Sequence, residues 1–218
     1  DKLIQAGYDT HLPAFERFVP VLIAAYDAAP DESLKEAVDM LVAWDKRSSF
    51  ESIETSLANH FGNELWKNLP PRGSVAPYDQ YEYLETQVAS DQYLEALKAA
   101  ITRMEADFGS WKVAWGDMNR FQRNTGDMVQ KFDDEKPSHP SKLVSGRWGG
   151  LASVGSRQYP GTKKWYGTSG NSFIASIEFG DKVRAKALMA GGLNSDPSSP
   201  HFDDQGAMYG RGEFRDVY

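Results

Sequence analysis

Cysteine is absent from the sequence of 218 residues. The chain therefore forms neither a disulfide framework nor a thiolate metal site, and its cysteine usage gives no direct information on its redox compartment. Long apolar runs are missing as well, because the longest one, residues 18–29, is interrupted by Pro20, Tyr26 and Asp27. That run is too short for a bilayer span, so the sequence predicts no membrane-spanning segment.

Clusters of basic side chains are also lacking. The chain has 24 Lys and Arg residues against 31 Asp and Glu residues, which gives a formal net charge of -7. This balance argues against nucleic acids and anionic membranes as partners. The first five residues include neither an initiator Met nor the apolar core of a signal peptide. Together with an equally abrupt end, they suggest a piece cut from a longer polypeptide.

The first half of the chain has the periodicity of amphipathic helices. Helices are expected within residues 13–26, 31–44, 49–69, 81–88 and 93–104. Asp31 and Ser49 are the predicted N-caps of the second and third helices. Pro20 is expected to bend the first helix or to set its true start. Residues 1–108 are thus predicted to be mainly α.

Beyond Phe108, Gly and Pro become frequent and short apolar stretches alternate, as in strands and turns. The clearest unit is a hairpin from Phe173 to Met189 that turns near Gly180 and Asp181. Its buried face is expected to carry Phe173, Ala175, Ile177 and Phe179. Weaker strands are predicted at 111–115 and 212–217, and a polar loop at 194–200. These patterns predict an α+β chain, helical over 1–108 and β-rich over 109–218, in one continuous structure because no flexible linker separates the parts.

Histidine and carboxylate side chains come nearest to a metal cluster at His201, Asp203 and Asp204. None of the four histidines makes the close His pair that zinc motifs use. Adjacent carboxylates in an extended segment point to opposite faces, so that at most part of this set converges. A structural loop is favoured over a metal site. The sequence leaves ion binding at this loop open.

Asp117 and Arg120 pair only if the chain turns between them, because residues three apart in a strand face opposite sides. A structural ion pair or a turn is favoured over a catalytic role, since neither a nucleophile nor a base accompanies them. The glycines at 146–150 and the Gly155–Ser156 step lack the spacing of a phosphate loop and are interpreted as turns. Ser169 lacks the Gly-x-Ser-x-Gly elbow of a nucleophile and is expected in a loop.

Six large aromatic residues gather in the second half of the chain. They are Trp111, Trp115, Trp148, Tyr159, Trp165 and Tyr166. Such a set can form a platform on which sugars stack. Large aromatic residues more often belong to a core or an interface, which is the favoured interpretation.

Three motifs follow one another in the last third of the chain. They are Gly-x-x-Gly-Asn-Ser-Phe at 167–173, Glu-Phe-Gly at 178–180 and Asp-Pro-x-Ser-Pro-His-x-x-Asp-Gln at 196–205. Their order resembles the end of the catalytic large chain of penicillin amidases and acyl-homoserine-lactone acylases. Residues 115–120 are similar to another segment of that family, and residues 41–45 resemble its helical portion. The resemblance is strong from Trp111 onward and looser before it.

The resemblance implies a four-layer αββα fold, a precursor that cuts itself into two chains, and hydrolysis of an N-acyl amide in the periplasm or outside the cell. It also implies an N-terminal Ser nucleophile whose own α-amino group assists as base. That Ser, the oxyanion-hole Asn and the calcium site of the family lie upstream of the part this chain resembles. Asp1 cannot replace the nucleophile. No catalytic, cofactor-binding or metal-binding residue is therefore assigned in this sequence.

Two function hypotheses follow. In the first, the chain is a scaffold-forming part of an acylase, its partner is the remainder of the precursor, and it leaves an apolar surface where that remainder packs. In the second, it is an autonomous module that binds glycans or peptides through its Trp and Tyr cluster. The sequence leaves the acyl and amine specificity open, with penicillins, homoserine lactones and lipopeptides as candidates.

Overall fold

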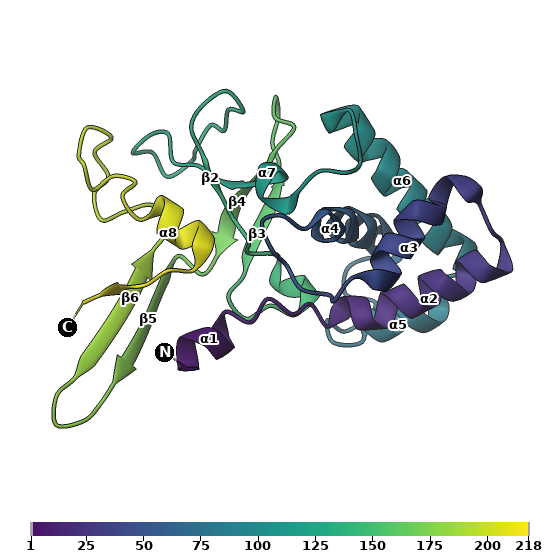
Figure 1. Cartoon of the computed structure of the whole chain (residues 1–218), viewed down its shortest axis with the longest axis horizontal. Coiled ribbons are helices and arrows are strands. Elements are labelled where there is room, and N and C mark those ends of the chain that lie inside the picture. The colour runs from purple at the N-terminus through teal and green to yellow at the C-terminus, as the bar shows by residue number, and fades with distance from the viewer. Residues whose placement is uncertain (1, 218) are drawn as a thin grey trace. The chain divides into compact units, whose positions relative to one another are not determined.

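The computed structural model describes residues 2–217 and has two compact units. Unit 1 combines Asp1–Thr10, Ser48–Glu51 and Trp115–Tyr218, whereas unit 2 combines His11–Arg47 and Ser52–Ala114. Unit 2 is helical, and the seven strands of the described residues all belong to unit 1 (Figure 1). The chain is therefore a mixed α and β protein, as predicted. The expected domain division between residues 108 and 109 stays a prediction.

Unit 2 consists of helices joined by turns and loops. They are α2 (Ala14–Ala28), η1 (Glu32–Leu34), α3 (Lys35–Ala43), α4 (Ile53–Leu65), η2 (Trp66–Asn68), α5 (Gln80–Gln87) and α6 (Ser90–Phe108). The predicted helical first half is confirmed. Asp31 is a cap, because its carboxylate accepts a hydrogen bond of 2.9 Å from the backbone N–H of Ser33.

Two details of these helices differ from the prediction. The cap of α4 is Ser52 rather than Ser49, since the Ser52 hydroxyl accepts a hydrogen bond of 2.9 Å from the Thr55 N–H. Pro20 lies inside α2 and does not set its start, which is at Ala14.

Helix α4 packs against α6, η2 and α3, and every residue from Thr55 to Gly62 is buried. Two of its polar side chains bond to its own backbone. Asn59 Nδ2 donates to Thr55 O at 2.8 Å, and His60 Nδ1 lies 3.1 Å from Ser56 O. Burial lowers the pKa of His60 to about 4, because the charged imidazolium loses its hydration there.

Unit 1 contains two sheets and several short helices. Its elements are α1 (Lys2–Gly7), α7 (Trp115–Met118), β1 (Asn119–Phe121), β2 (His139–Pro140), η3 (Gly146–Trp148), β3 (Val154–Gln158), β4 (Trp165–Gly170), β5 (Phe173–Glu178), β6 (Arg184–Met189), α8 (Gly206–Arg211) and β7 (Arg215–Asp216). One sheet has the order β2-β1-β4-β3 and the other β5-β6-β7. The β1–β4 pair is parallel, and the other pairs are antiparallel.

The hairpin of β5 and β6 is confirmed, with Phe173 opposite Met189 and Glu178 opposite Arg184. The prediction of its buried face is wrong. Phe173, Ile177 and Phe179 are 59%, 51% and 83% exposed. The alternate residues Ile174 and Ser176 are half-buried instead. The reason is that Leu188, opposite Ile174, packs into a core cluster with Leu143, Val154 and Tyr209.

The other strands, turns and loops predicted for residues 109–218 were confirmed only in part. Residues 111–115 form no strand, whereas 212–217 contain β7 and 194–200 form the expected loop. Gly149 turns the chain with a φ of 105°. Gly155 and Ser156 lie in β3 and Ser169 lies in β4, so these residues are not in the turns and loop expected for them. No helix between residues 2 and 217 combines the length and the apolar character that a membrane crossing requires.

Candidate functional site

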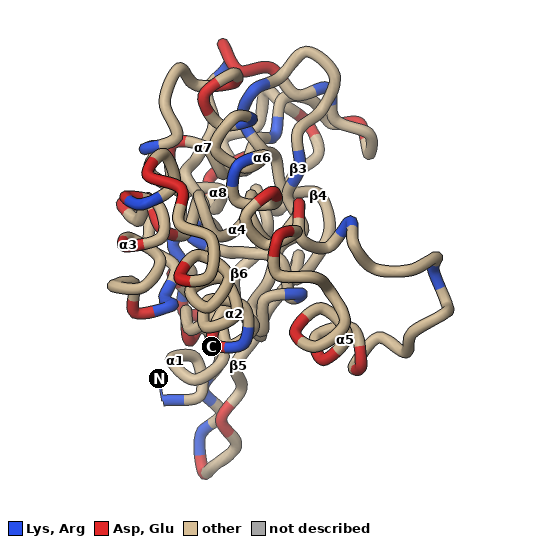
Figure 2. The backbone as a smooth tube through the Cα atoms, turned by 90° about the vertical axis from the view of Figure 1, so that its right-hand side faces the viewer, with Lys and Arg blue, Asp and Glu red and all other residues tan. Residues whose placement is uncertain are grey.

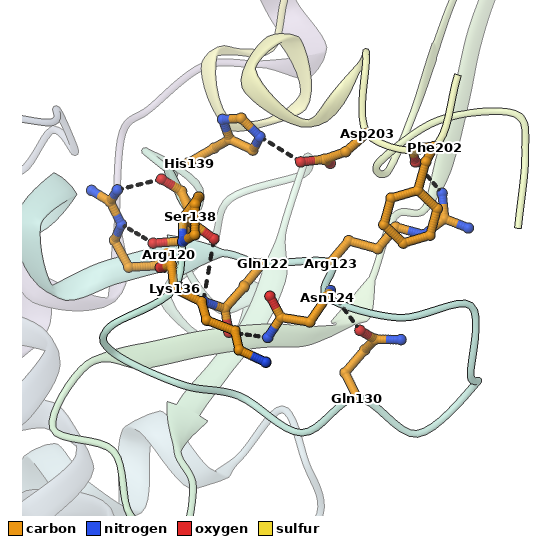
Figure 3. A network of polar contacts seen from close by, with 11 residues as sticks. Arg120, Gln122, Arg123, Asn124, Gln130, Lys136, Ser138, His139, Phe202 and Asp203 are labelled. Carbon is orange, nitrogen blue, oxygen red and sulfur yellow. Dashed lines mark hydrogen bonds and ion pairs between the residues drawn. The ribbon is translucent and has the colours of Figure 1, made fainter. Parts of the chain in front are cut away.

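The segment from His201 to Gln205, called here the C-terminal loop, separates its two carboxylates. His201 Nδ1 lies 2.9 Å from Asp204 Oδ2, whereas Asp203 Oδ2 lies 2.7 Å from Nε2 of His139 on β2 (Figure 3). Asp203 and Asp204 therefore have different histidine partners, and they lie in turns rather than in the extended segment from which their divergence was predicted. Within the described residues, no three His, Asp or Glu side chains come together as a metal would require.

Phe202 and Gln205 join the same loop to other elements of unit 1. The Arg123 guanidinium lies 4.3 Å from the centre of the Phe202 ring, and its Nη1 donates to Phe202 O at 2.5 Å. Gln205 donates its backbone N–H to Gly191 O at 2.7 Å, and its side-chain oxygen accepts from Met189 N at 3.2 Å. The loop is thus bonded both to the segment after β1 and to the end of β6.

The Arg120 side chain connects neighbouring segments of unit 1 by hydrogen bonds. Its guanidinium donates to Ser138 Oγ at 3.0 Å, to Ser138 O at 2.5 Å and to Gly116 O at 2.7 Å (Figure 3). Burial lowers its pKa, and the negative charge of Asp117 opposes that effect. The chain does turn between Asp117 and Arg120, because α7 ends at Met118 and β1 begins at Asn119. Arg120 therefore holds the chain before β2 against the start of β1.

Sequence reasoning did not single out Gln122, which organises the long loop between β1 and β2. Its Nε2 donates to Asp133 O at 2.8 Å, and its Oε1 accepts from Asp133 N at 3.0 Å and from Asn124 Nδ2 at 2.9 Å. Gln130 accepts from Asn124 N at 2.9 Å within the same loop (Figure 3). The only sequence signal for Gln122 is its place two positions after residues 115–120, which resemble the acylase family.

The Gly-Asn-Ser-Phe segment also has a structural task. Asn171 Oδ1 accepts from Ser153 N at 3.0 Å, and Asn171 O accepts from the Tyr209 hydroxyl at 2.6 Å. Gly170 has a φ of 139°, and a Cβ there would overlap the backbone oxygen of Ser153. Glycine is thus required at the end of β4, and Asn171 joins β4 and β5 to the chain before β3 and to α8.

A hollow of about 270 Å³ lies beside this segment. It is lined by Phe121, Val154, Gly167, Thr168, Ser169, Gly170, Ser172, Ala190 and Tyr209. Its polar side chains are hydroxyls only, and burial raises the pKa of Tyr209. Without a histidine, a lysine or a carboxylate in this lining, Ser169 and Ser172 have no base to activate them as nucleophiles.

The aromatic set lies mainly in the interior. Trp115, Trp148, Trp165 and Tyr166 are at most 9% exposed. The rings of Trp115 and Trp165 meet edge to face, with centroids 6.0 Å apart. A platform for sugars must be accessible to solvent, so the burial of four of the six residues favours the core interpretation.

We predict that Asp203→Ala lowers the free energy of unfolding by about 1 kcal/mol, because it removes the partner of His139 from a pair whose two side chains are each 31% exposed. Urea unfolding followed by circular dichroism measures this change. The matched control is Asp216→Ala, since Asp216 is 86% exposed and lies 3.9 Å from Lys186. Equal effects of the two substitutions would contradict the structural importance of the Asp203 contact.

The sequence was compared with known proteins. It matches the model of the penicillin amidase family over residues 1–218. Among solved structures, the chain is similar to the thermostable penicillin G acylase from Alcaligenes faecalis in orthorhombic form, with 15% identity and a TM-score of 0.42. That match covers 96% of this chain and 44% of the acylase chain, so the 218 residues span less than half of that relative. On the strength of the family match over its whole length, the chain belongs to the penicillin amidase family.

Proposed function

We propose that this chain is the scaffold-forming part of an acylase that hydrolyses a linear N-acyl amide, and that the nucleophile belongs to another part of the polypeptide. One observation carries the proposal. The motif residues Asn171, Asp203 and Gln205 use their polar atoms to join loops to the sheets of unit 1. They do not converge on a common reacting centre.

The chemistry of amide hydrolysis supports this separation of the scaffold from the catalytic groups. Attack on an acyl carbonyl needs an activated nucleophile, a group that accepts its proton and donors that stabilise the oxyanion. The serines of the hydroxyl-lined hollow have no base beside them. In our proposal these three groups come from the remainder of the acylase, and the 218 residues support them.

Further parts of the proposal rest on the family. The two sheets of unit 1 would belong to a four-layer αββα fold, and the enzyme would mature by autoproteolytic processing of a precursor. The partner of this chain would be the rest of that precursor, with neither nucleic acid nor membrane involved. We place the enzyme in the periplasm or outside the cell.

The isolated 218-residue chain is expected to show no turnover of N-acyl amides, whereas the full-length processed enzyme releases the free amine. A panel of penicillin, acyl-homoserine-lactone and lipopeptide substrates tests this expectation. The full-length variants Ser169→Ala and Ser172→Ala serve as controls and should retain activity, because neither hydroxyl is the nucleophile. Turnover by the isolated chain that a single substitution within it abolishes would contradict the proposal.

A further inference from the structure

The longest connection between the helices of unit 2 lies between η2 and α5, over residues 69–79. Residues 71–74 and 77–79 of this loop are exposed, and Tyr78 is 78% exposed. Figure 2 shows the loop as a wide excursion of the chain that leads into α5, with one basic position along it. That position is Arg72, the only Lys or Arg of residues 69–79. The loop thus presents a single cationic side chain to solvent.

The sequence around Arg72 has the pattern of a protease recognition site. Residues 69–74 are Leu-Pro-Pro-Arg-Gly-Ser, and Arg72 is the only Lys or Arg of the 218 residues that directly follows a proline. Serine proteases of the trypsin class hold an arginine in an acidic S1 pocket, which determines where they cleave. Members of this class with an apolar S2 pocket also recognise a proline before that arginine. The chain therefore matches this recognition chemistry at one place.

The backbone before Arg72 is already extended. Leu69 has a φ of -65° and a ψ of 143°. Each proline fixes its own φ and pushes the residue before it towards an extended conformation, so that Pro70 and Pro71 keep this part of the loop extended. An extended peptide is the form that pairs with the strand edge of a binding protein. The segment before the Arg72–Gly73 bond therefore needs little reordering to enter a protease.

The Arg72–Gly73 bond itself lies at the centre of a β-turn. A hydrogen bond of 3.0 Å from Ser74 N to Pro71 O closes the turn, and Gly73 has a φ of 92°. Glycine adopts this conformation and an extended one about equally readily, so the turn opens without steric strain. A Cβ built on Gly73 would meet no atom within 4 Å. The bond is therefore accessible from the side of Gly73.

Contacts on both sides of the loop hold its two ends in place. Tyr81 of α5 stacks on Phe18 of α2 with ring centroids 6.3 Å apart, and it meets Trp66 of η2 edge to face at 5.4 Å. Arg17 Nε of α2 donates to Glu85 Oε2 of α5 at 2.7 Å. These contacts join residues before the loop to residues after it. They do not depend on an intact chain between them.

We propose that the Arg72–Gly73 bond is a site of limited proteolysis for a serine protease that recognises Pro-Arg, and that the cut leaves both parts of unit 2 joined. The protease nucleophile attacks the Arg72 carbonyl carbon, and the Gly73 nitrogen leaves as an amine. One water molecule then hydrolyses the acyl-enzyme, so that Arg72 ends in a carboxylate and the protease is regenerated. Both new charges lie in the exposed turn, where they stay hydrated. This site does not depend on the amidase chemistry of the proposed function.

A second Arg-Gly bond in the chain, Arg211–Gly212, is a matched internal control. Arg211 ends α8 and pairs with Glu213 at 2.8 Å. Gly212 N donates to Tyr209 O at 3.2 Å, and a Cβ on Gly212 would overlap the ring of Tyr8. This helix end must unfold and leave the Tyr8 ring before a protease can bind it. The same dipeptide is therefore protected at this position.

Limited digestion of the full-length processed enzyme with trypsin compares the two bonds, because trypsin cleaves after arginine without requiring a preceding proline. Peptide mass spectrometry measures the rate at which each new N-terminus forms. We expect the ratio of the Arg72 rate to the Arg211 rate to be at least about tenfold higher in the folded than in the unfolded enzyme. A ratio that is the same in both states would overturn the proposal.

Thrombin, a serine protease that prefers Pro-Arg, tests the recognition sequence. In the folded full-length enzyme it should create one new N-terminus within these 218 residues, at Gly73, and Arg72→Gln should abolish it. The two parts should then elute together in gel filtration and separate in urea. Resistance of the Arg72–Gly73 bond to thrombin, or parts that separate without denaturant, would overturn the proposal. Amidase activity is not a readout of these experiments, so a failed proposed function leaves their outcome unchanged.

Discussion

Gly210→Ala is expected to lower the free energy of unfolding of this chain by about 3 kcal/mol. Gly210 lies in α8, and a Cβ at this position would overlap the backbone oxygen of Pro140 in β2. A backbone atom cannot rotate away as a side chain does, so α8 must move off β2. That movement also strains the hydrogen bond of 3.1 Å from Lys142 N to Gly210 O. Urea unfolding followed by circular dichroism measures the loss.

The matched control for this substitution is Gly180→Ala. A Cβ at Gly180 would meet only the backbone oxygen of Lys182 at 3.8 Å, which is an ordinary contact. The control should therefore change the free energy of unfolding by less than about 0.5 kcal/mol. A Gly210→Ala chain as stable as this control would show that α8 and β2 do not pack as closely as described.

His60 is expected to make the chain less stable in acid. Its pKa is lowered by burial from the ordinary value of 6.5 to about 4, so the unfolded chain binds its proton first as the pH falls. The stability is fully present above about pH 6.5 and declines as the pH falls towards 4. The difference corresponds to at most about 3 kcal/mol. Urea unfolding at several pH values between 4 and 7 measures this slope.

Two variants on α4 isolate the imidazole. His60→Gln keeps a polar side chain near Ser56 O but has no charged form. The free energy of unfolding of this variant should therefore fall less between pH 6.5 and 4 than that of the unmodified chain. Ser56→Ala, one turn earlier, removes a buried hydroxyl without a partner and leaves the imidazole, so it should retain the slope. Identical slopes for the two variants would rule out His60 as the cause.

The helices could be predicted because each apolar stripe repeats at the helical period and because caps are local features. The N-cap of α4 could not be predicted from the sequence, since Ser48, Ser49 and Ser52 all precede this helix. Only the hydrogen bond from Thr55 N distinguishes Ser52. Local sequence thus determined which segments are helical, and backbone geometry in three dimensions decided where one of them begins.

The hairpin shows which structural information is missing from an alternating pattern of apolar residues. The pattern specified two strands and their turn correctly, but it did not specify which face meets a core. That choice was made by Leu143, Val154 and Tyr209, which lie far from β5 in the sequence and pack on the side of Leu188. The same limit applies to the C-terminal loop. Its motif was visible in the sequence, whereas the contact of Asp203 with His139 spans 64 positions.

The segments of unit 1 are far apart in the sequence, which sets a constraint on its synthesis. Tyr8 meets Phe214 edge to face, with ring centroids 5.5 Å apart, although unit 2 is encoded between the segments of unit 1. A six-residue helix such as α1 is not stable alone in water. At translation rates of about 5 to 20 residues per second, about 10 to 40 s pass between the synthesis of α1 and the synthesis of Phe214. Unit 2, whose segments end at Ala114, can fold during that interval, whereas unit 1 closes only as the last residues of these 218 leave the ribosome.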